Sequence, residues 1–398
     1  MIDITSHRQG AILNHNHGVE TESGLKIRVE GISETGRPVK INGVPAEMDG
    51  RIFRADVELK EQYNNVTASV LTPSGNYSQE LTLVWDKKSF KRYNCYIDDH
   101  SFLFMELTRQ KPARAFDHFY LAALKKIHDE TGLKVTLNTF FRNDHDPDGY
   151  LLSEMPDIWK SEFEDQSDWL RFSFHSYSEF PDRPYLEASA EDFGKDYDLV
   201  QNEIIRFAGE KSFIVPMIIH WGNIHPVVAA EYRRRGSRYY GRSMRPMVMG
   251  GPSLAERQKG GDMKQVEKRA SARDERVSPI EGFGLYYDDQ EEISYLAKHK
   301  AYYNPALDMF IQLGTVCCNL TTQDVIRDRI AKQFEIAEKY GVEAFSFASH
   351  EQYSFPFYPN YIPDHLDRIA LTARLFHDAG YKGVFYPEGI MGNTAWGE

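Results

Sequence analysis

Two strand-like runs of this sequence end in residues that can bind a metal ion. The first begins at Tyr93 and ends in the adjacent acids Asp98 and Asp99; the second ends in His175, with Glu179 four positions later. Carboxylates and imidazoles are common ligands of zinc and similar divalent ions. If the two runs are neighbouring strands, these side chains converge on one cation, with one aspartate as a ligand and the other free as a general base.

Each pair taken alone also has a structural interpretation. Adjacent aspartates can cap a helix or a turn, and an isolated histidine is often a core residue that lies beside a surface acid. The four-residue spacing places His175 and Glu179 on one face only if that segment turns helically. The metal-site hypothesis therefore depends on the convergence of both runs rather than on either pair.

Two further strand-like runs end in a histidine. One ends in His350, which is a natural proton donor to a leaving group because the unperturbed histidine pKa lies near 6.5. The other ends in His220 and Trp221, where the indole could stack on a sugar ring while the imidazole lines the pocket. On a β/α scaffold the carboxyl ends of the strands share one face, so we expect these residues near the metal ligands.

Other residues at these strand ends complete a predicted substrate-binding set with His220 and Trp221. Arg142 and Asn143 end the run that begins near residue 133, and they either bind substrate or cap the loop. Glu351 and Tyr353 follow shortly after His350.

The elements that must position these residues follow a β/α rhythm from Arg92 onward. Apolar runs alternate with amphipathic segments of helical length, which indicates a largely parallel sheet. We expect strands near residues 93–98, 133–141, 169–175, 212–220, 280–287, 343–348 and 382–386, and helices over about 112–132, 322–340 and 364–379. This succession predicts an α/β domain over 92–398 with a complete or distorted (β/α) barrel.

Two regions differ from this rhythm. Residues 1–88 contain short runs of alternating apolar and polar residues, such as Leu25–Val29, with turn signals such as Asn42-Gly43 between them. This pattern predicts a small all-β sandwich ahead of the α/β domain. Residues 233–279 form an irregular, arginine- and glycine-rich insertion. It could be a lid, an oligomer contact, an ordered excursion with short strands, a contact with an anionic substrate or a solvated loop.

The composition limits the partners and the compartment. The 398 residues carry a net charge of −12, which disfavours nucleic acids and anionic membranes because the field of the protein repels phosphate. Aromatic residues make up 13%, which suits packing and also carbohydrate recognition. Three cysteines cannot form a disulfide framework, and the first residues lack the pattern of a signal peptide. We expect a cytoplasmic protein, or a secreted one if a leader precedes this sequence; a homo-oligomer stays open.

The domain over 92–398 resembles the polysaccharide deacetylase superfamily (NodB-homology, carbohydrate esterase family 4) as an outlying branch. The resemblance is carried by three motifs: Tyr96-Ile97-Asp98-Asp99 for Thr-Phe-Asp-Asp, His175-Ser176-Tyr177-Ser178-Glu179 for His-Ser/Thr-x-x-His, and Ser349-His350-Glu351 for Leu-x-His. Glu179 stands where the family has its second histidine. Residues 1–88 resemble the immunoglobulin-like modules of carbohydrate-active enzymes.

The resemblance implies a deacetylase-type distorted barrel and a metal-dependent hydrolase that removes acetyl groups from a saccharide. It assigns Asp98 as the base, His350 as the acid, and Asp99, His175 and Glu179 as ligands of Zn²⁺ or another divalent metal.

Two other functions stay open at this point. A metal-free glycoside hydrolase on the same barrel would use carboxylates such as Asp98, Glu351 or Glu388. A catalytically inactive relative would only bind carbohydrate.

Overall fold

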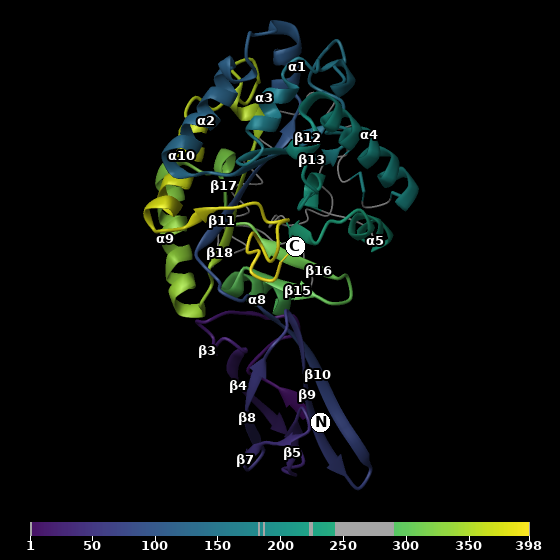
Figure 1. The fold of residues 1–398 in the computed structure, drawn as a ribbon, viewed down its shortest axis with the longest axis vertical. Helices are drawn as coiled ribbons and strands as arrows, with labels where there is room; N and C mark the ends of the chain where they lie inside the picture. The colour runs from purple at the N-terminus through teal and green to yellow at the C-terminus, as the bar shows by residue number, and fades with distance from the viewer. Residues whose placement is uncertain (1, 182–183, 186–187, 223–225, 243–289, 398) are drawn as a thin grey trace. The chain divides into compact units, whose positions relative to one another are not determined.

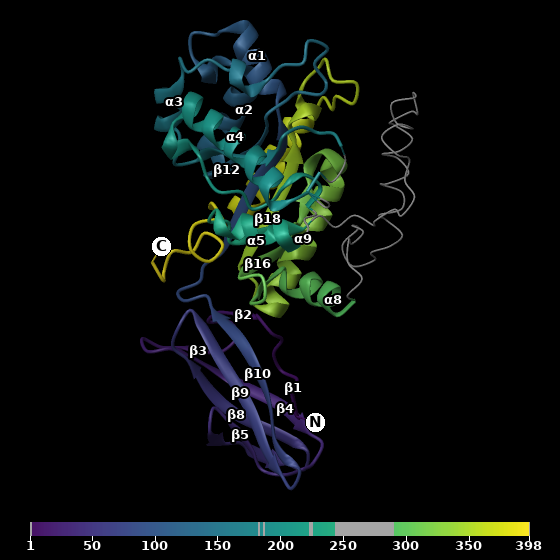
Figure 2. The ribbon, with the colours of Figure 1, turned by 90° about the vertical axis from the view of Figure 1, so that its right-hand side faces the viewer.

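The structure is a computed structural model that describes residues 2–181, 184–185, 188–222, 226–242 and 290–397. It is a mixed α/β protein whose contacts divide the chain into two compact units. Unit 1 contains the residues before Lys91, with Ala301–Ile311 and the residues after Gly392; unit 2 contains Lys91–Lys300 and Gln312–Gly392. Figures 1 and 2 show the elements of each unit from two sides. The two late segments that cluster with unit 1 were not part of the predicted N-terminal domain.

Unit 1 is built on two five-stranded sheets, ordered β1-β4-β8-β7 with β3 beside β4, and β2-β10-β9-β5-β6. The strands are β1 Ile2–Ile4, β2 Ile12–Leu13, β3 Val19–Glu20, β4 Leu25–Ser33, β5 Val39–Ile41, β6 Val44–Pro45, β7 Glu47–Asp49, β8 Ile52–Leu59, β9 Tyr63–Thr72 and β10 Gly75–Trp85. In β4, Leu25, Ile27 and Val29 are buried while Lys26 and Arg28 are exposed. The alternation in the sequence therefore corresponds to one buried and one solvated face.

The later segments join unit 1 through specific contacts. The backbone N–H of Tyr303 donates to the carbonyl of Gly10 at 2.8 Å, and the Tyr303 ring lies 4.7 Å from that of Tyr63. Gly10 has a φ of +77°, and a Cβ there would lie 1.6 Å from the Tyr303 carbonyl oxygen, so this close approach requires glycine. The Asn393 amide donates to the Asp86 carboxylate at 2.7 Å.

Unit 2 centres on a parallel sheet ordered β13-β12-β11-β18-β17, with β19 beside β11. Its strands are β11 Arg92–His100, β12 Val135–Phe140, β13 Leu170–Ser176, β17 Val316–Cys317, β18 Ala344–His350 and β19 Lys382–Gly383. Every residue of β11 is buried, as is typical of a parallel strand covered on both faces. Among the described residues the path from β13 to β17 stays open, and no closed barrel is seen there.

Helices flank this sheet (Figure 1). The helices among the described residues are α1 Phe102–Gln110, α2 Phe119–Thr131, α3 Lys160–Asp165, α4 Ala190–Ala208, α5 Pro226–Arg234, α8 Gln290–His299, α9 Gln323–Tyr340 and α10 His365–Asp378. Helix α10 packs against both α2 and α9, and its Phe376 stacks on Tyr93 of β11 with ring centres 5.0 Å apart. Helix α4 packs on β13. None of the helices in the described part of the chain has the length and apolar character needed to cross a bilayer.

The helix ends follow local sequence signals. Helix α2 begins after His118, whose ring accepts a hydrogen bond from the Tyr120 amide, and it ends at Gly132 with a φ of +68°. Helix α9 ends in the same way at Gly341, with a φ of +66°. The predicted helix near 112–132 is shorter than expected, since a 3-10 turn at Ala115–Asp117 precedes α2.

The expected strand over 212–220 is wrong. Only an isolated bridge between Phe213 and Phe172 forms there, and the chain then turns at His220–Gly222. Pro216 interrupts this run and cannot donate to a strand ladder. The expected strand over 280–287 and most of the 233–279 insertion lie outside the described residues. The described start of that insertion contains the end of α5 and strand β14, Tyr239–Arg242. Strands β15 Ala301–Asn304 and β16 Met309–Leu313 come later in the chain.

Candidate metal centre

The carboxyl end of β11 is irregular where it delivers Asp98 and Asp99. The pairing of β11 with β12 shifts register between Ile97 and His100, and Asp99 has a φ of +69°. A regular strand would point two adjacent side chains to opposite faces. The bulge and the left-handed backbone at Asp99 remove that constraint, so both carboxylates reach the same region.

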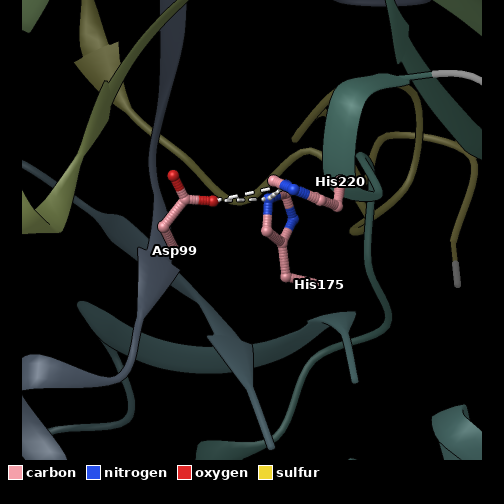
Figure 3. A group of neighbouring side chains, drawn as sticks. All are labelled: Asp99, His175 and His220. Carbon is pink, nitrogen blue, oxygen red and sulfur yellow. Dashed lines mark hydrogen bonds and ion pairs between the residues drawn. The ribbon is translucent and has the colours of Figure 1, made fainter. Parts of the chain in front are cut away.

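Asp99, His175 and His220 come together at this strand end (Figure 3). His175 Nε2 lies 3.2 Å and His220 Nδ1 lies 3.4 Å from Asp99 Oδ1, and the two imidazole nitrogens are 3.4 Å apart. All three residues are buried, and their ligand atoms lie within 4.8 Å of one another. This group could hold one metal ion.

The donor atoms in this group fit a metal ion. Asp99 Oδ1 is buried and finds no hydrogen-bond partner among the described residues. Asp99 Oδ2 accepts a hydrogen bond from Gln352 at 3.0 Å, and His220 Nε2 lies 2.9 Å from the Glu179 backbone carbonyl. The carbonyl can only accept, so the proton of the His220 ring is on Nε2 and Nδ1 keeps a lone pair for a ligand. Two imidazoles and one carboxylate with an open position are typical of catalytic zinc sites.

The electrostatics favour an ionised Asp99. Burial opposes ionisation of this carboxyl, but the positive field of His350 and the adjacent rings of His175 and His220 outweigh it. Together they hold the pKa of Asp99 well below its usual value. The Asp99 carboxylate is therefore charged across the physiological pH range.

Asp98 lies beside the group without belonging to it. Its Oδ1 accepts a hydrogen bond from the Asn138 amide at 2.7 Å and lies 3.9 Å from His175 Nδ1. Asp98 pairs in register with His350 of β18, which places the predicted base and the predicted acid on adjacent strands.

His350 is oriented by Asn319. The Asn319 amide oxygen accepts a hydrogen bond from His350 Nδ1 at 2.9 Å, and the Cys317 thiol donates to the same oxygen at 3.0 Å. This contact directs the other ring nitrogen, Nε2, to the site, 4.0 Å from Asp99 Oδ2. Burial lowers the pKa of His350, but the interactions with Cys317 and with the carboxylate of Asp99 outweigh burial and raise it to about 9.

Glu179 does not join the group in which it was expected. Its side-chain carboxylate pairs with His145, and only its backbone carbonyl contacts His220. Strand β13 ends at Ser176 and the next residues bend without forming a helical turn. The four-residue spacing therefore does not place Glu179 on the face of His175. His220, which was expected to line the pocket, takes the third position.

The structure also corrects Glu351 as a substrate-binding residue. This fully buried carboxylate accepts hydrogen bonds from the amides of Ser101, Phe102 and Leu103 at 2.8, 2.9 and 2.7 Å. It therefore caps the N-terminus of α1. Burial raises the pKa of Glu351 to about 8, although the three amide hydrogen bonds act in the opposite direction.

The other substrate-binding candidates have mixed surroundings. Arg142 is partly exposed and pairs with Asp144, whereas Asn143 is buried and accepts a hydrogen bond from the His145 amide. Tyr353 is buried, with its ring 5.4 Å from that of Tyr358. Trp221 has a φ of +66° and lies edge-on to His220.

Sequence analysis did not single out Asn138, Asn319 or Gln352 for the site. The amides of Asn138 and Gln352 donate to the paired aspartates, and that of Asn319 orients His350. Their positions in the sequence were the only indication that they could reach the site. Gln352 follows Glu351, and Asn138 lies on the strand beside β11.

Comparison with known proteins adds little to this geometry. No family model matches the chain, and no curated protein matches it. Among the solved structures that match is one described as a candidate alpha-galactosidase from Bacteroides fragilis, with 11% sequence identity and a TM-score of 0.28. That match covers 94% of this chain and 78% of the other. A likeness at this level defines neither fold nor function.

Proposed function

We propose that this protein is a metal-dependent hydrolase that removes acetyl groups from an acetylated saccharide, and that its metal is Zn²⁺ or a similar divalent ion. The observation that carries the proposal is the convergence of Asp99, His175 and His220, with Asp98 and His350 beside them. A carboxylate base, an imidazole acid and a cation site are the parts that hydrolysis of an acyl group requires.

In the proposed reaction, Asp98 and His350 each carry out one proton transfer. A bound cation would polarise the acyl carbonyl and lower the pKa of a nearby water. Asp98, held by Asn138, takes the proton from the attacking water. His350 presents Nε2 to the site and donates a proton from it to the departing amine or alcohol. Asn319 keeps the His350 ring in that orientation.

Metal analysis and acetate release test the proposal together. We expect purified protein to bind one Zn²⁺ per chain, and Asp99→Ala and His175→Ala each to abolish binding while the fold is retained. Asp98→Asn should keep the metal and lose acetate release from acetylated oligosaccharides. Full metal occupancy in both ligand variants would refute the ligand set. Saccharide binding without acetate release by the wild type would favour the inactive relative.

Contacts in the site count against the glycoside hydrolase. Glu351 is enclosed by three amide hydrogen bonds, and the carboxylate of Glu388 pairs with Arg171 at 2.8 Å. A retaining mechanism needs a second free carboxylate about 5 Å from the first. Neither residue offers one to Asp98.

The finer description of the fold belongs to the same proposal. We take unit 2 as an open variant of the deacetylase-type distorted barrel and unit 1 as an immunoglobulin-like sandwich. A carbohydrate is the partner that this proposal requires; the cytoplasmic location and the absence of nucleic-acid and membrane partners stay predictions.

A further inference from the structure

A cavity of about 450 Å³ lies within unit 2. It is bounded by α1, by the loop around Asn143–Pro147 and by the loop around Phe357–Pro359. Its size is within the range of small-molecule sites in proteins. None of the proposed metal ligands or proton-transfer residues lines it, so the cavity is distinct from the metal centre.

One lining residue of the cavity, Phe357, has an exposed aromatic ring that packs against other aromatic rings. Phe357 is 52% exposed, and its ring stacks on that of buried Phe102 with centres 5.2 Å apart and planes 30° apart. Phe355 packs against the same ring at 5.5 Å. A fixed phenylalanine that leaves half of its surface in water is a ready platform for the apolar face of a ligand.

The charged side chains that line the cavity form pairs with other side chains of the protein. A single guanidinium nitrogen of Arg109, Nη2, donates to both oxygens of the buried Asp146 carboxylate, at 2.9 and 2.8 Å. Glu106 contacts His118 at 2.9 Å. Asp146 neutralises the charge of Arg109, and Glu106 adds a further carboxylate to the lining. The cavity therefore disfavours an anionic ligand. A ring face combined with polar groups and no excess of cations suits a neutral, hydroxyl-rich ligand.

Two chains of contacts connect the cavity with the metal centre. On one side, lining residue His145 pairs with Glu179, whose backbone carbonyl contacts the ligand His220. On the other, the ring of lining residue Tyr358 lies 5.4 Å from that of Tyr353, which lies 6.4 Å from that of His350. On each side, a single residue (Glu179 or Tyr353) therefore lies between the lining of the cavity and a residue of the candidate site.

We propose that the cavity is a saccharide subsite that holds a neutral sugar unit next to the acetylated one, with Phe357 as its stacking platform. This inference rests on the proposed function, because it takes the reacting molecule to be a saccharide. The side chain of Phe357 would determine affinity for oligosaccharides and would have no effect on a small acetyl ester that occupies the metal centre alone.

Calorimetric titration of the full chain with neutral trisaccharides (N-acetylated chitotriose, cellotriose and xylotriose) tests the subsite. We expect at least one to bind the wild type, and Phe357→Ala to weaken its Kd about tenfold. Phe357→Tyr should keep wild-type affinity because it keeps the ring. Phe119→Ala is the matched control, since this phenylalanine is 43% exposed on α2 and does not line the cavity. Equal affinities in the two alanine variants, no binding of any neutral trisaccharide, or tighter binding of an anionic trigalacturonate would each overturn the subsite.

The same measurements separate this inference from the proposed function. His175→Ala removes a proposed metal ligand and leaves the cavity lining intact, so it should still bind the trisaccharide. Trisaccharide binding that depends on Phe357 without any acetate release would support the subsite and count against the deacetylase. Acetate release that is identical in the wild type and in Phe357→Ala, with p-nitrophenyl acetate and with acetylated chitotriose, would support the deacetylase and overturn the subsite.

Discussion

Strand β4 of unit 1 and strand β11 of unit 2 use the same backbone geometry for different purposes. Along β4 the side chains alternate between buried and solvated positions, and the strand stays regular through its pairing with β8. Along β11 every side chain is buried, and the strand breaks its register where Asp98 and Asp99 leave it. The regular strand β4 contributes to the stability of unit 1. The irregular end of β11 brings the residues of the candidate site in unit 2 together.

This contrast predicts that changes in the two units act on different properties. Substitutions in the sheets of unit 1 should change stability and leave metal binding intact. Substitutions at the strand ends of unit 2 should change metal binding or catalysis and leave the stability of unit 1 intact. The following predictions test that separation, from the largest expected effect to the smallest.

Phe53→Ala in β8 should have the largest effect on stability. The ring is fully buried in unit 1, and its removal leaves a cavity that costs about 3–5 kcal/mol of unfolding free energy. Denaturant unfolding followed by fluorescence measures the loss. The Zn²⁺ affinity of the folded variant should equal that of the wild type. A parallel loss of Zn²⁺ affinity would show that the two units are not separable in this way.

His220→Ala should weaken Zn²⁺ binding by about 100-fold or more, since it removes one of the three proposed ligands. Glu179→Gln is the matched comparison, because Glu179 contacts the group through its backbone carbonyl, which this substitution retains. Its Zn²⁺ affinity should stay within about tenfold of the wild type. Competition with a chromophoric chelator measures both values. A larger loss of Zn²⁺ affinity in Glu179→Gln than in His220→Ala would indicate that the Glu179 side chain is a metal ligand.

Asn319→Ala should lower kcat for acetate release by roughly tenfold or more, because His350 loses the acceptor that fixes its ring. KM and the Zn²⁺ affinity should change little. Nitrogen NMR of the His350 ring should show a single tautomer, protonated on Nδ1, in the neutral wild-type imidazole and a mixture in the variant. Asn319→Asp should retain the tautomer. An unchanged tautomer ratio in Asn319→Ala would show that other groups orient the ring.

His365 should contribute the smallest effect, a dependence of stability on pH. Its ring lies between the hydroxyls of Ser349 and Ser354, both at 2.6 Å. Burial lowers the pKa of His365 to about 3, and the positive potentials of His350 and Arg368 act in the same direction, against Asp364. The unfolded chain takes up this proton below pH 6.5 and the folded chain does not, so stability is lost as pH falls from about 6.5 to 3.

Comparison with His365→Gln isolates this contribution. A single group contributes at most about 1.4 kcal/mol per pH unit to the unfolding free energy. We expect the wild type to lose stability more steeply than the variant between pH 6 and 4, as measured by denaturant unfolding at several pH values. Equal slopes in the two proteins would show that His365 is not neutral in the folded state.

The sequence alone determined the strand alternation in unit 1, most of the β/α order in unit 2 and the strand ends at Asp99 and His175. These features depend on periodicities of two and about 3.6 residues, which neighbouring residues reveal. Only the tertiary structure decided that His220 is the third member of the group, that Glu179 turns to His145 and that Glu351 caps α1. Each of these depends on which distant segments lie side by side and on how the backbone bends after a strand, and no local pattern encodes either.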